Sequence, residues 1–275
     1  MKKLFASAVL ALSVTSLAAC GSSGGSDSSK EKEIKIVATS TPHAEILEEA
    51  ASILEKKDIK LDVEVNDDYS LQNKMLASGE VDANFFQHTP YLKNAMKEDK
   101  SFDLVSAGGV HLEPMGVYSK KYKNLDEIPK NGTIMISNNV AEEGRMLSLL
   151  QQGGLIKLKE GVDAVSATKK DIVENKKNIN IKVGGDAALM PKAYENEEAD
   201  AVIINTNYAI GADLTPTKDA IELEGEDSPY VNIVAVKKGD EDREEIKELM
   251  KVLHSKEIQD FIKEKYKGSI IPVSK

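Results

Sequence analysis

Short apolar runs alternate with helical patterns over most of the chain. The run Ile34–Ala38 predicts a strand, and apolar residues then recur at helical spacing between Pro42 and Lys57. Leu61–Val65 alternates apolar and polar residues, which is typical of a half-buried strand. Similar short runs predict strands at Leu104–Ala107, Thr133–Ser137, Ile179–Val183, Ala201–Ile204 and Val231–Val236. This order of strands and helices predicts an α/β fold with mainly parallel sheets.

The C-terminal part of the chain carries a long amphipathic pattern. Apolar residues three and four positions apart between Glu241 and Tyr266 predict a helix, which we expect to be broken near Ser255. No Pro/Gly/Ser-rich linker divides the body of the chain. Two lobes that the chain crosses between remain compatible with the pattern, and the candidate crossings are Gly108–Tyr118 and Gly225–Tyr230.

The N-terminal residues have the pattern of a secretory signal. Lys2 and Lys3 precede an apolar stretch from Leu4 to Ala19, which at about 16 residues is shorter than the roughly 20 that a spanning helix needs. The stretch ends in Leu-Ala-Ala-Cys, which resembles a bacterial lipobox with Cys20 as the lipidated residue. The alternative is an ordinary signal peptide with an incidental cysteine. Residues 1–19 are therefore predicted to be a signal peptide.

The segment after the cysteine predicts a tether. Residues 21–33 are rich in Gly and Ser, then charged, and contain no apolar residue. Such a segment behaves as a flexible coil with a span of roughly 20 Å. We therefore assign residues 20–33 to the lipidated cysteine and its tether, and we expect the folded body to begin near Ile34.

Composition and motifs exclude several classes of function. The chain has 36 Lys and Arg against 46 Asp and Glu, a net charge of −10, which argues against nucleic acid as a partner. Its single cysteine excludes an intramolecular disulfide framework. No hydrolase elbow, phosphate loop or zinc-protease motif occurs, so we expect no enzyme and no cofactor. The alternative that remains is a transition-metal receptor, with His43, His88, His111 and Glu113 as its ligands.

Four segments combine aromatic, amide and histidine side chains. They read DANFFQHTPYL, which we expect to be loop-like, then HLEPMG, AVIINTNYA and SPYVN. With the lipobox, they make the whole chain resemble the methionine-binding lipoprotein family, also called the NlpA or MetQ family. The family comprises the substrate-binding subunits of methionine ABC importers. The resemblance implies a periplasmic-binding-protein-like fold, in which two lobes, 34–115 with 223–275 and 116–222, enclose a ligand cleft.

The same resemblance implies location and partners. The protein is expected on the extracytoplasmic face of the cell membrane, anchored by lipid on Cys20. Its expected ligand is L-methionine, which it would deliver to a membrane permease driven by a cytoplasmic ATPase. Another amino acid or a methionine-containing dipeptide remains an alternative ligand.

Arginine is scarce in the body of the chain, which contains only Arg145 and Arg243. A ligand carboxylate buried in a cleft favours the planar bidentate donor that arginine offers. Arg243 lies in a charged run and is expected to be solvated, whereas Arg145 stands at the start of an apolar helical pattern. We therefore predict Arg145 as the carboxylate partner, in agreement with the resemblance; a helix-surface cation is the alternative.

A thioether gains from contact with aromatic rings, so we expect an aromatic pocket for the ligand side chain. The resemblance implies Tyr69, Phe86 and Tyr91 as its lining and His88 as a polar residue that closes it. Phe85 fits the pocket and the core equally well. Side-chain amides that offer donors and acceptors to the ligand are expected from Asn205, Asn207 and Asn232, although the first two could instead cap turns.

One segment departs from the family pattern. Related sequences usually read PND-x-TN before the glycine and arginine, whereas this chain reads SNNVAEEGR, so that Glu142 replaces the usual asparagine. The carboxylate of Glu142 could pair with a ligand ammonium, compete for Arg145 or point to solvent. The sequence leaves these three alternatives open, and with them the identity of the ligand.

Overall fold

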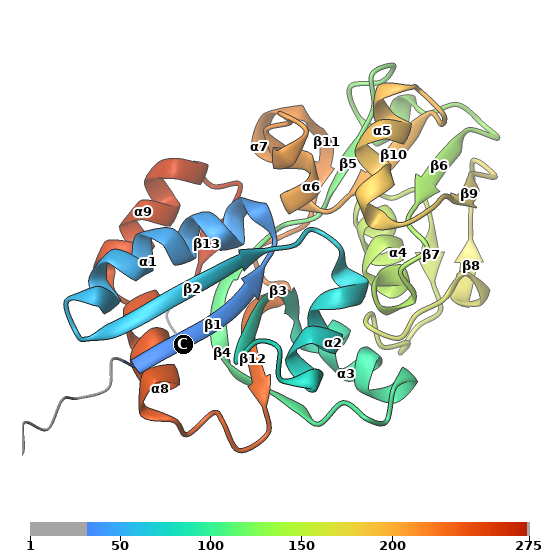
Figure 1. Cartoon of the computed structure of the whole chain (residues 1–275). Coiled ribbons are helices and arrows are strands. Elements are labelled where there is room, and N and C mark those ends of the chain that lie inside the picture. Colours follow the sequence, from blue (N-terminus) through green and yellow to red (C-terminus); the bar gives the residue numbers. More distant parts are fainter. Residues whose placement is uncertain (1–31, 274–275) are drawn as a thin grey trace, which may run out of the picture. The chain divides into compact units, whose positions relative to one another are not determined.

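The computed structural model describes residues 32–273. The predicted signal peptide, Cys20 and all but the last two residues of the predicted tether lie outside this range. The described part contains two large sheets, each covered by helices on both faces (Figure 1). The α/β prediction is confirmed, and the two sheets form the cores of the two lobes.

The first sheet has six strands in the order β13-β4-β12-β3-β1-β2. Their bounds are β1 (Lys32–Ala38), β2 (Ile59–Val65), β3 (Ala83–His88), β4 (Leu104–Leu112), β12 (Val231–Lys237) and β13 (Ile271–Pro272). β1 begins two residues before the predicted start of the body. It pairs in parallel with β2 and β3, whereas β12 lies antiparallel between β3 and β4.

Helices cover both faces of this sheet because side chains alternate along its strands. Ile36 of β1 packs with three helices on one face, whereas the next residue, Val37, packs with two helices on the other. The first face carries α1 (Glu45–Glu55), α8 (Glu244–Leu253) and α9 (Lys256–Tyr266), and the second carries α2 (Tyr69–Ser78) and α3 (Thr89–Glu98). The predicted C-terminal helix is thus broken as expected: Ser255 caps α9 by accepting the N–H of Ile258.

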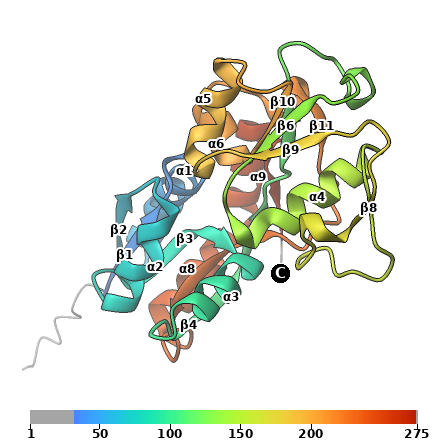
Figure 2. The same cartoon turned by 90° about the vertical axis from the view of Figure 1, so that its right-hand side faces the viewer.

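The second sheet has five strands in the order β11-β5-β10-β6-β9. Its strands and helices are β5 (Gly116–Tyr118), β6 (Thr133–Ile136), β9 (Asn180–Val183), β10 (Ala201–Ile204), β11 (Ala220–Leu223), α4 (Glu143–Gln152), α5 (Met190–Glu195), α6 (Thr206–Gly211) and α7 (Pro216–Asp219). α4 covers one face, and α5 and α6 cover the other (Figure 2).

Short elements complete the described chain. A separate two-stranded sheet pairs β7 (Lys157–Leu158) with β8 (Ile172–Glu174). The short helical turns are η1 (Ser40–Ala44), η2 (Leu125–Glu127), η3 (Val140–Glu142), η4 (Lys169–Asp171) and η5 (Ala187–Leu189).

The chain passes between the two sheets at the two predicted crossings. It leaves the first sheet after β4, enters the second at β5, and returns between β11 and β12. We keep 34–115 with 223–275, and 116–222, as the proposed bounds of the lobes. The first crossing places Glu113 between the sheets, and the second does the same for Glu224.

Two expectations from the sequence are wrong. The sheets are mixed rather than mainly parallel, because strands that follow a crossing, such as β12, enter antiparallel to their neighbours. The segment DANFFQHTPYL is not a loop: it forms β3 and the start of α3, and all six residues of β3 are buried. Its polar residues misled the prediction, since Asn84 and Gln87 are hydrogen-bonded to Asn73 of α2 inside the protein.

The start of α4 depends on a close approach at Gly144. A Cβ atom added there would lie 2.2 Å from the carbonyl oxygen of Ala164 and 3.0 Å from the nitrogen of Ala167. We predict that Gly144→Ala lowers the free energy of unfolding by about 1–3 kcal/mol, because the segment 164–167 must shift. Urea denaturation measures this change. The matched control is Gly225→Ala, whose Cβ would have no described atom within 4 Å beyond its own residue and the two adjacent ones. Equal losses in the two variants would contradict the prediction.

Candidate functional site

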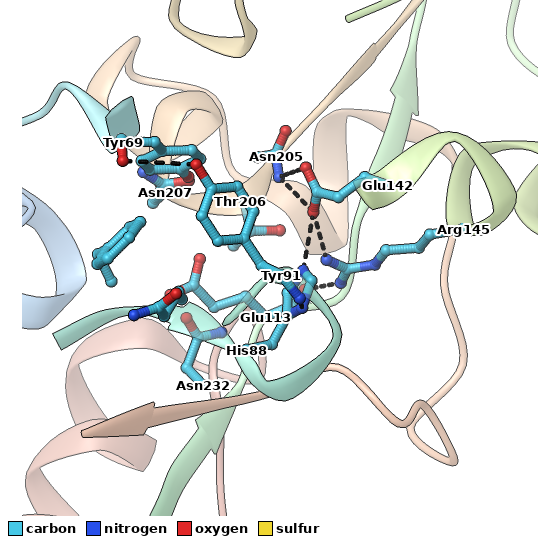
Figure 3. A pocket seen from close by; sticks show the side chains of 12 residues that line it. Tyr69, His88, Tyr91, Glu113, Glu142, Arg145, Asn205, Thr206, Asn207 and Asn232 are labelled. Carbon is cyan, nitrogen blue, oxygen red and sulfur yellow. Dashed lines mark hydrogen bonds and ion pairs between the residues drawn. The ribbon is translucent and has the colours of Figure 1, made fainter. Parts of the chain in front are cut away.

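A cavity lies at the junction of the two sheets. Its lining residues surround about 350 Å³ of space that no atom fills, a volume that includes open solvent. All eight predicted site residues line it, together with four more that the sequence reasoning did not assign to the ligand pocket (Figure 3). The predicted residues are Tyr69, Phe86, His88, Tyr91, Arg145, Asn205, Asn207 and Asn232, and the additional ones are Gln87, Glu113, Glu142 and Thr206.

Three aromatic rings form one wall of the cavity. The ring centroid of Tyr69 lies 5.4 Å from that of Phe86 and 6.1 Å from that of Tyr91, and the latter two are 5.6 Å apart. The hydroxyl of Tyr69 donates to Asn207 Oδ1 at 2.7 Å, which fixes the ring. Phe85, in contrast, is fully buried in the core of the first sheet and does not line the cavity. The wall is therefore apolar, with its hydroxyl groups directed to its edges.

The guanidinium of Arg145 is buried at the opposite side of the cavity and is extensively hydrogen-bonded. Its Nε donates to both oxygens of Glu224 at 3.1 Å, and its Nη2 donates to Glu224 Oε2 at 2.5 Å. Nη2 also donates to the main-chain oxygen of Glu113 at 2.7 Å. The ring of Tyr230 lies 4.5 Å from the guanidinium carbon. Arg145 is thus no helix-surface cation, and it joins α4 to both crossings.

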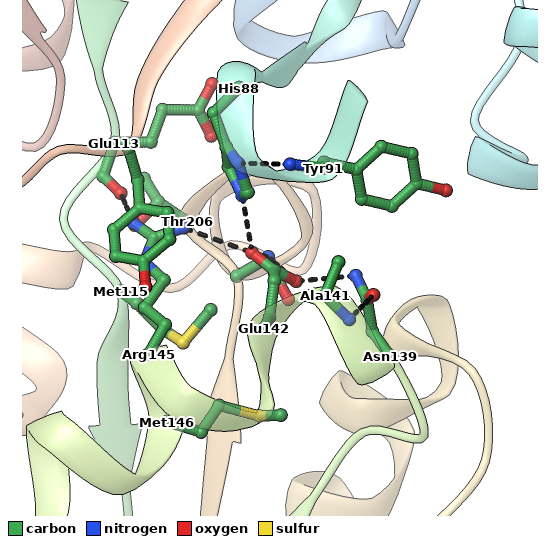
Figure 4. A network of polar contacts seen from close by, with 12 residues as sticks. His88, Tyr91, Glu113, Met115, Asn139, Ala141, Glu142, Arg145, Met146 and Thr206 are labelled. Atoms are coloured by element: carbon green, nitrogen blue, oxygen red, sulfur yellow. Dashed lines mark hydrogen bonds and ion pairs between the residues drawn. The ribbon is translucent and has the colours of Figure 1, made fainter. Parts of the chain in front are cut away.

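Glu142 completes the surroundings of Arg145 (Figure 4). Its Oε1 lies 3.1 Å from Arg145 Nη1, and the side chain of Glu142 is 2% exposed. The expectation that it could point to solvent is therefore wrong, and the contact with Arg145 is present. Burial alone would raise the pKa of Glu142, but the hydrogen bond from His88 and the charge of Arg145 lower it to about 2. The carboxylate is ionised at neutral pH.

His88 connects β3 to Glu142. As the N-cap of α3 it accepts the main-chain N–H of Tyr91 at Nδ1, at 3.1 Å, so that Nε2 carries the proton. Nε2 then donates to Glu142 Oε1 at 3.2 Å. Burial lowers the pKa of His88, which keeps the ring neutral. His88 therefore lies at the polar end of the cavity, beside the aromatic wall.

Each of the three predicted amides is fixed by one hydrogen bond partner. Asn205 Nδ2 donates to both oxygens of Glu142 at 3.0 Å, Asn207 Oδ1 accepts from Tyr69, and Asn232 Oδ1 lies 3.0 Å from His43 Nε2. Asn205 is the N-cap residue of α6, but its side chain makes no capping bond. Within residues 32–273, no hydrogen bond is present at the other end of each amide, and these ends can receive a ligand.

Only part of the alternative metal set comes together. His111 Nε2 and His43 Nε2 lie 2.7 and 3.3 Å from Glu113 Oε1, and these ligand atoms are within 4.8 Å of one another. His88 bonds to Glu142 instead. Burial lowers the pKa of His43 to about 4 and that of His111 to about 3. The cluster is therefore a network of neutral imidazoles around one buried carboxyl group.

Several contacts in the site had no signal in the sequence. Glu224 lies in the acidic stretch ELEGED and reads as solvated surface, yet it is the main partner of Arg145. Tyr208, whose ring centroid is 5.0 Å from that of Tyr69, supports the aromatic wall from α6. Arg243 pairs with Asp82 and Glu245 at the protein surface, away from the cavity.

Two α/β lobes with a cavity at their junction have the architecture of a solute-binding protein. The family model for the NlpA lipoproteins matches residues 34–274, and the chain belongs to this family. The methionine-binding lipoprotein MetQ of Bacillus subtilis is 55% identical over 275 residues, 100% of either chain. A crystal structure of a Bacillus subtilis lipoprotein shares 56% identity with a TM-score of 0.87, covering 89% of this chain and 99% of that one. A nutrient-binding protein from Burkholderia cenocepacia, solved bound to methionine, shares 41% identity with a TM-score of 0.82, covering 87% and 99%.

The buried histidines predict how stability depends on pH. In the unfolded chain His43 and His111 take up protons near pH 6.5, whereas in the folded protein their pKa values are lowered to about 4 and about 3. The unfolded state therefore binds more protons as the pH falls from 6.5 to 4.5, and the free energy of unfolding decreases by about 1.4 kcal/mol per pH unit and proton. Glu113, whose pKa burial raises, acts in the opposite sense.

The variant His111→Gln isolates one of these protons, since its amide still offers an N–H to Glu113. We expect its unfolding free energy, measured by urea denaturation at several pH values, to fall less steeply than that of the wild type. Equal slopes below pH 5.5 would contradict the neutral, buried state of His111.

Proposed function

We propose that this protein is a lipid-anchored solute-binding protein that captures L-methionine and delivers it to an ABC importer. The observation that carries the proposal is one cavity with an aromatic wall facing a polar wall of buried charges and amides. An amino acid with a thioether side chain matches both walls. The family membership and the methionine-bound relative from Burkholderia cenocepacia support the same ligand.

The ligand side chain would lie against Tyr69, Phe86 and Tyr91. Each favourable contact between sulfur and an aromatic ring contributes about 0.3–1.5 kcal/mol. The ligand ammonium would lie near the carboxyl group of Glu113, which lines the cavity. Its carboxylate would approach Arg145, His88 and Asn205, and the free amide ends of Asn207 and Asn232 would be further polar contacts for the ligand.

Closure of the two lobes would retain the ligand. Tyr69, His88 and Asn232 belong to the first sheet and its helices, whereas Arg145, Asn205 and Asn207 belong to the second. A ligand that contacts both sets stabilises the closed arrangement, and the two crossings would act as the hinge. No step of catalysis is needed for capture and delivery.

The membrane anchor would be the lipid on Cys20. Within residues 32–273, no helix is long and apolar enough to cross a membrane. The lipoprotein names of the relatives and the Leu-Ala-Ala-Cys sequence support attachment to the extracytoplasmic face of the cell membrane. A permease and a cytoplasmic ATPase would be the partners that accept the ligand.

The cluster of His43, His111 and Glu113 is the observation that favours a second candidate, a receptor for a transition metal. It is the weaker candidate because Glu113 Oε1 already lies within hydrogen-bonding distance of both imidazoles. In addition, His88, the remaining predicted ligand, is hydrogen-bonded to Glu142. The aromatic wall also has no role in binding a metal ion.

We predict that the full-length lipoprotein in detergent, freed of bound solute by dialysis, binds L-methionine with a micromolar or lower dissociation constant. Phe86→Leu should weaken L-methionine binding about tenfold and affect norleucine, which lacks the sulfur, less strongly. The matched control is Phe261→Leu on α9, which does not line the cavity. Isothermal titration calorimetry measures all three proteins; unchanged affinity in Phe86→Leu would contradict the proposed side-chain pocket.

The anchor is tested in cells labelled with radioactive palmitate. We expect the wild-type protein and the tether variant Ser22→Ala to carry the label, and Cys20→Ala to lose it, because the thioester or thioether needs the thiol of Cys20. Label retained on Cys20→Ala would show that the anchor was assigned to the wrong residue.

A further inference from the structure

The carboxylate of Glu142 is surrounded by hydrogen-bond donors (Figure 4). Its Oε1 accepts from His88 Nε2 at 3.2 Å and from Arg145 Nη1 at 3.1 Å, and Asn205 Nδ2 lies 3.0 Å from both of its oxygens. Asn139 Nδ2 donates to Oε2 at 2.8 Å. Three of these four donors are residues predicted to bind the ligand. Glu142 thus holds the groups that a ligand carboxylate would use.

The hydrogen bonds of Arg145 leave little room for a second carboxylate. Nε and both N–H groups of Nη2 are directed to Glu224 and to the carbonyl of Glu113, and one N–H of Nη1 is directed to Glu142. A single N–H of Nη1 remains. A ligand carboxylate can therefore reach Arg145 only through Nη1, where Glu142 already occupies one of the two N–H groups.

The charges around the cavity also disfavour a ligand carboxylate. Glu142 and Glu113 line the cavity, Glu224 pairs with Arg145 from behind, and Arg145 is the one basic side chain in the lining. A ligand that brings an ammonium group reduces this excess of negative charge, whereas a ligand carboxylate adds to it. His88 belongs to the lobe of the first sheet and Glu142 to the lobe of the second. The hydrogen bond between them therefore connects the two lobes, as a bound ligand would.

We propose that Glu142 is an intramolecular occupant of the carboxylate subsite and thereby a determinant of specificity. This inference rests on the proposed function. A free amino acid must displace the Glu142 carboxylate from Arg145, His88 and Asn205 before its own carboxylate can bind. A methionine whose carboxyl group is an uncharged amide, as in methioninamide or at the N-terminus of a peptide, binds beside Glu142 and pairs its ammonium with it.

Calorimetric titration with L-methionine and L-methioninamide tests this on the full-length lipoprotein in detergent. Glu142→Gln keeps the size of the side chain and removes its charge. We expect it to bind L-methionine at least tenfold more tightly than the wild type and L-methioninamide at least threefold more weakly. A residue that only supported the fold would change both affinities in the same direction, so the opposite signs are the diagnostic result.

Glu143→Gln is the matched control, because it removes the same charge at the next residue along the chain. The side chain of Glu143 does not line the cavity, and it accepts the main-chain N–H of Lys169. Its two affinities should stay within twofold of the wild type. If Glu142→Gln does not fold, the shorter Glu142→Asn carries the same expectation.

Two outcomes would overturn the inference, and they are distinguishable. Binding of L-methionine by the wild type with no gain in either Glu142 variant would refute the role of Glu142 and leave the proposed function intact. Absence of heat with both ligands in the wild type and in every folded variant would refute the proposed function itself.

Discussion

The burial of one guanidinium organises the centre of this protein. Arg145 is 4% exposed, and a buried charge is tolerated only when its hydrogen bonds are satisfied and its charge is balanced. Its partners come from three places: Glu224 from the crossing before β12, the carbonyl of Glu113 from the crossing after β4, and Glu142 from η3. The hydrogen bonds and ion pairs of Arg145 therefore hold both connections between the sheets at the start of α4. The cavity forms beside that point.

The polar groups of the cavity are oriented by contacts on their far sides. Tyr69 holds Asn207, His43 faces Asn232, and the N-cap geometry of α3 sets the tautomer of His88. Preorganisation of this kind lowers the entropic cost of binding a small ligand. The rings of the aromatic wall pack on one another, and the same hydrogen bond to Asn207 fixes Tyr69. Recognition thus combines fixed polar groups at one end of the cavity with an apolar wall. In our proposal, Glu142 determines whether the cavity favours a ligand with a free carboxylate or one with an uncharged amide.

Much of the fold and the identity of the cavity residues could be predicted from the sequence. Strands such as β1 and β10 are short apolar runs with clear boundaries, and the break at Ser255 carries a capping residue. The direction of the strands could not be predicted, because it depends on where the chain returns from the second sheet. β3 was misread for a related reason: its polar side chains are buried against α2, and only three-dimensional contacts show that they are satisfied.

The role of Glu142 also could not be predicted from the sequence alone. The sequence marks it as a departure from the family pattern but leaves its direction open, since that depends on Asn205 and His88, which lie far away along the chain. A crystal structure of the protein with L-methionine tests the central claim most directly. We expect the ligand carboxylate to lie on Arg145 and the Glu142 carboxylate to have moved away from it. A bound L-methionine with its carboxylate elsewhere, and with the contact between Glu142 and Arg145 intact, would contradict it.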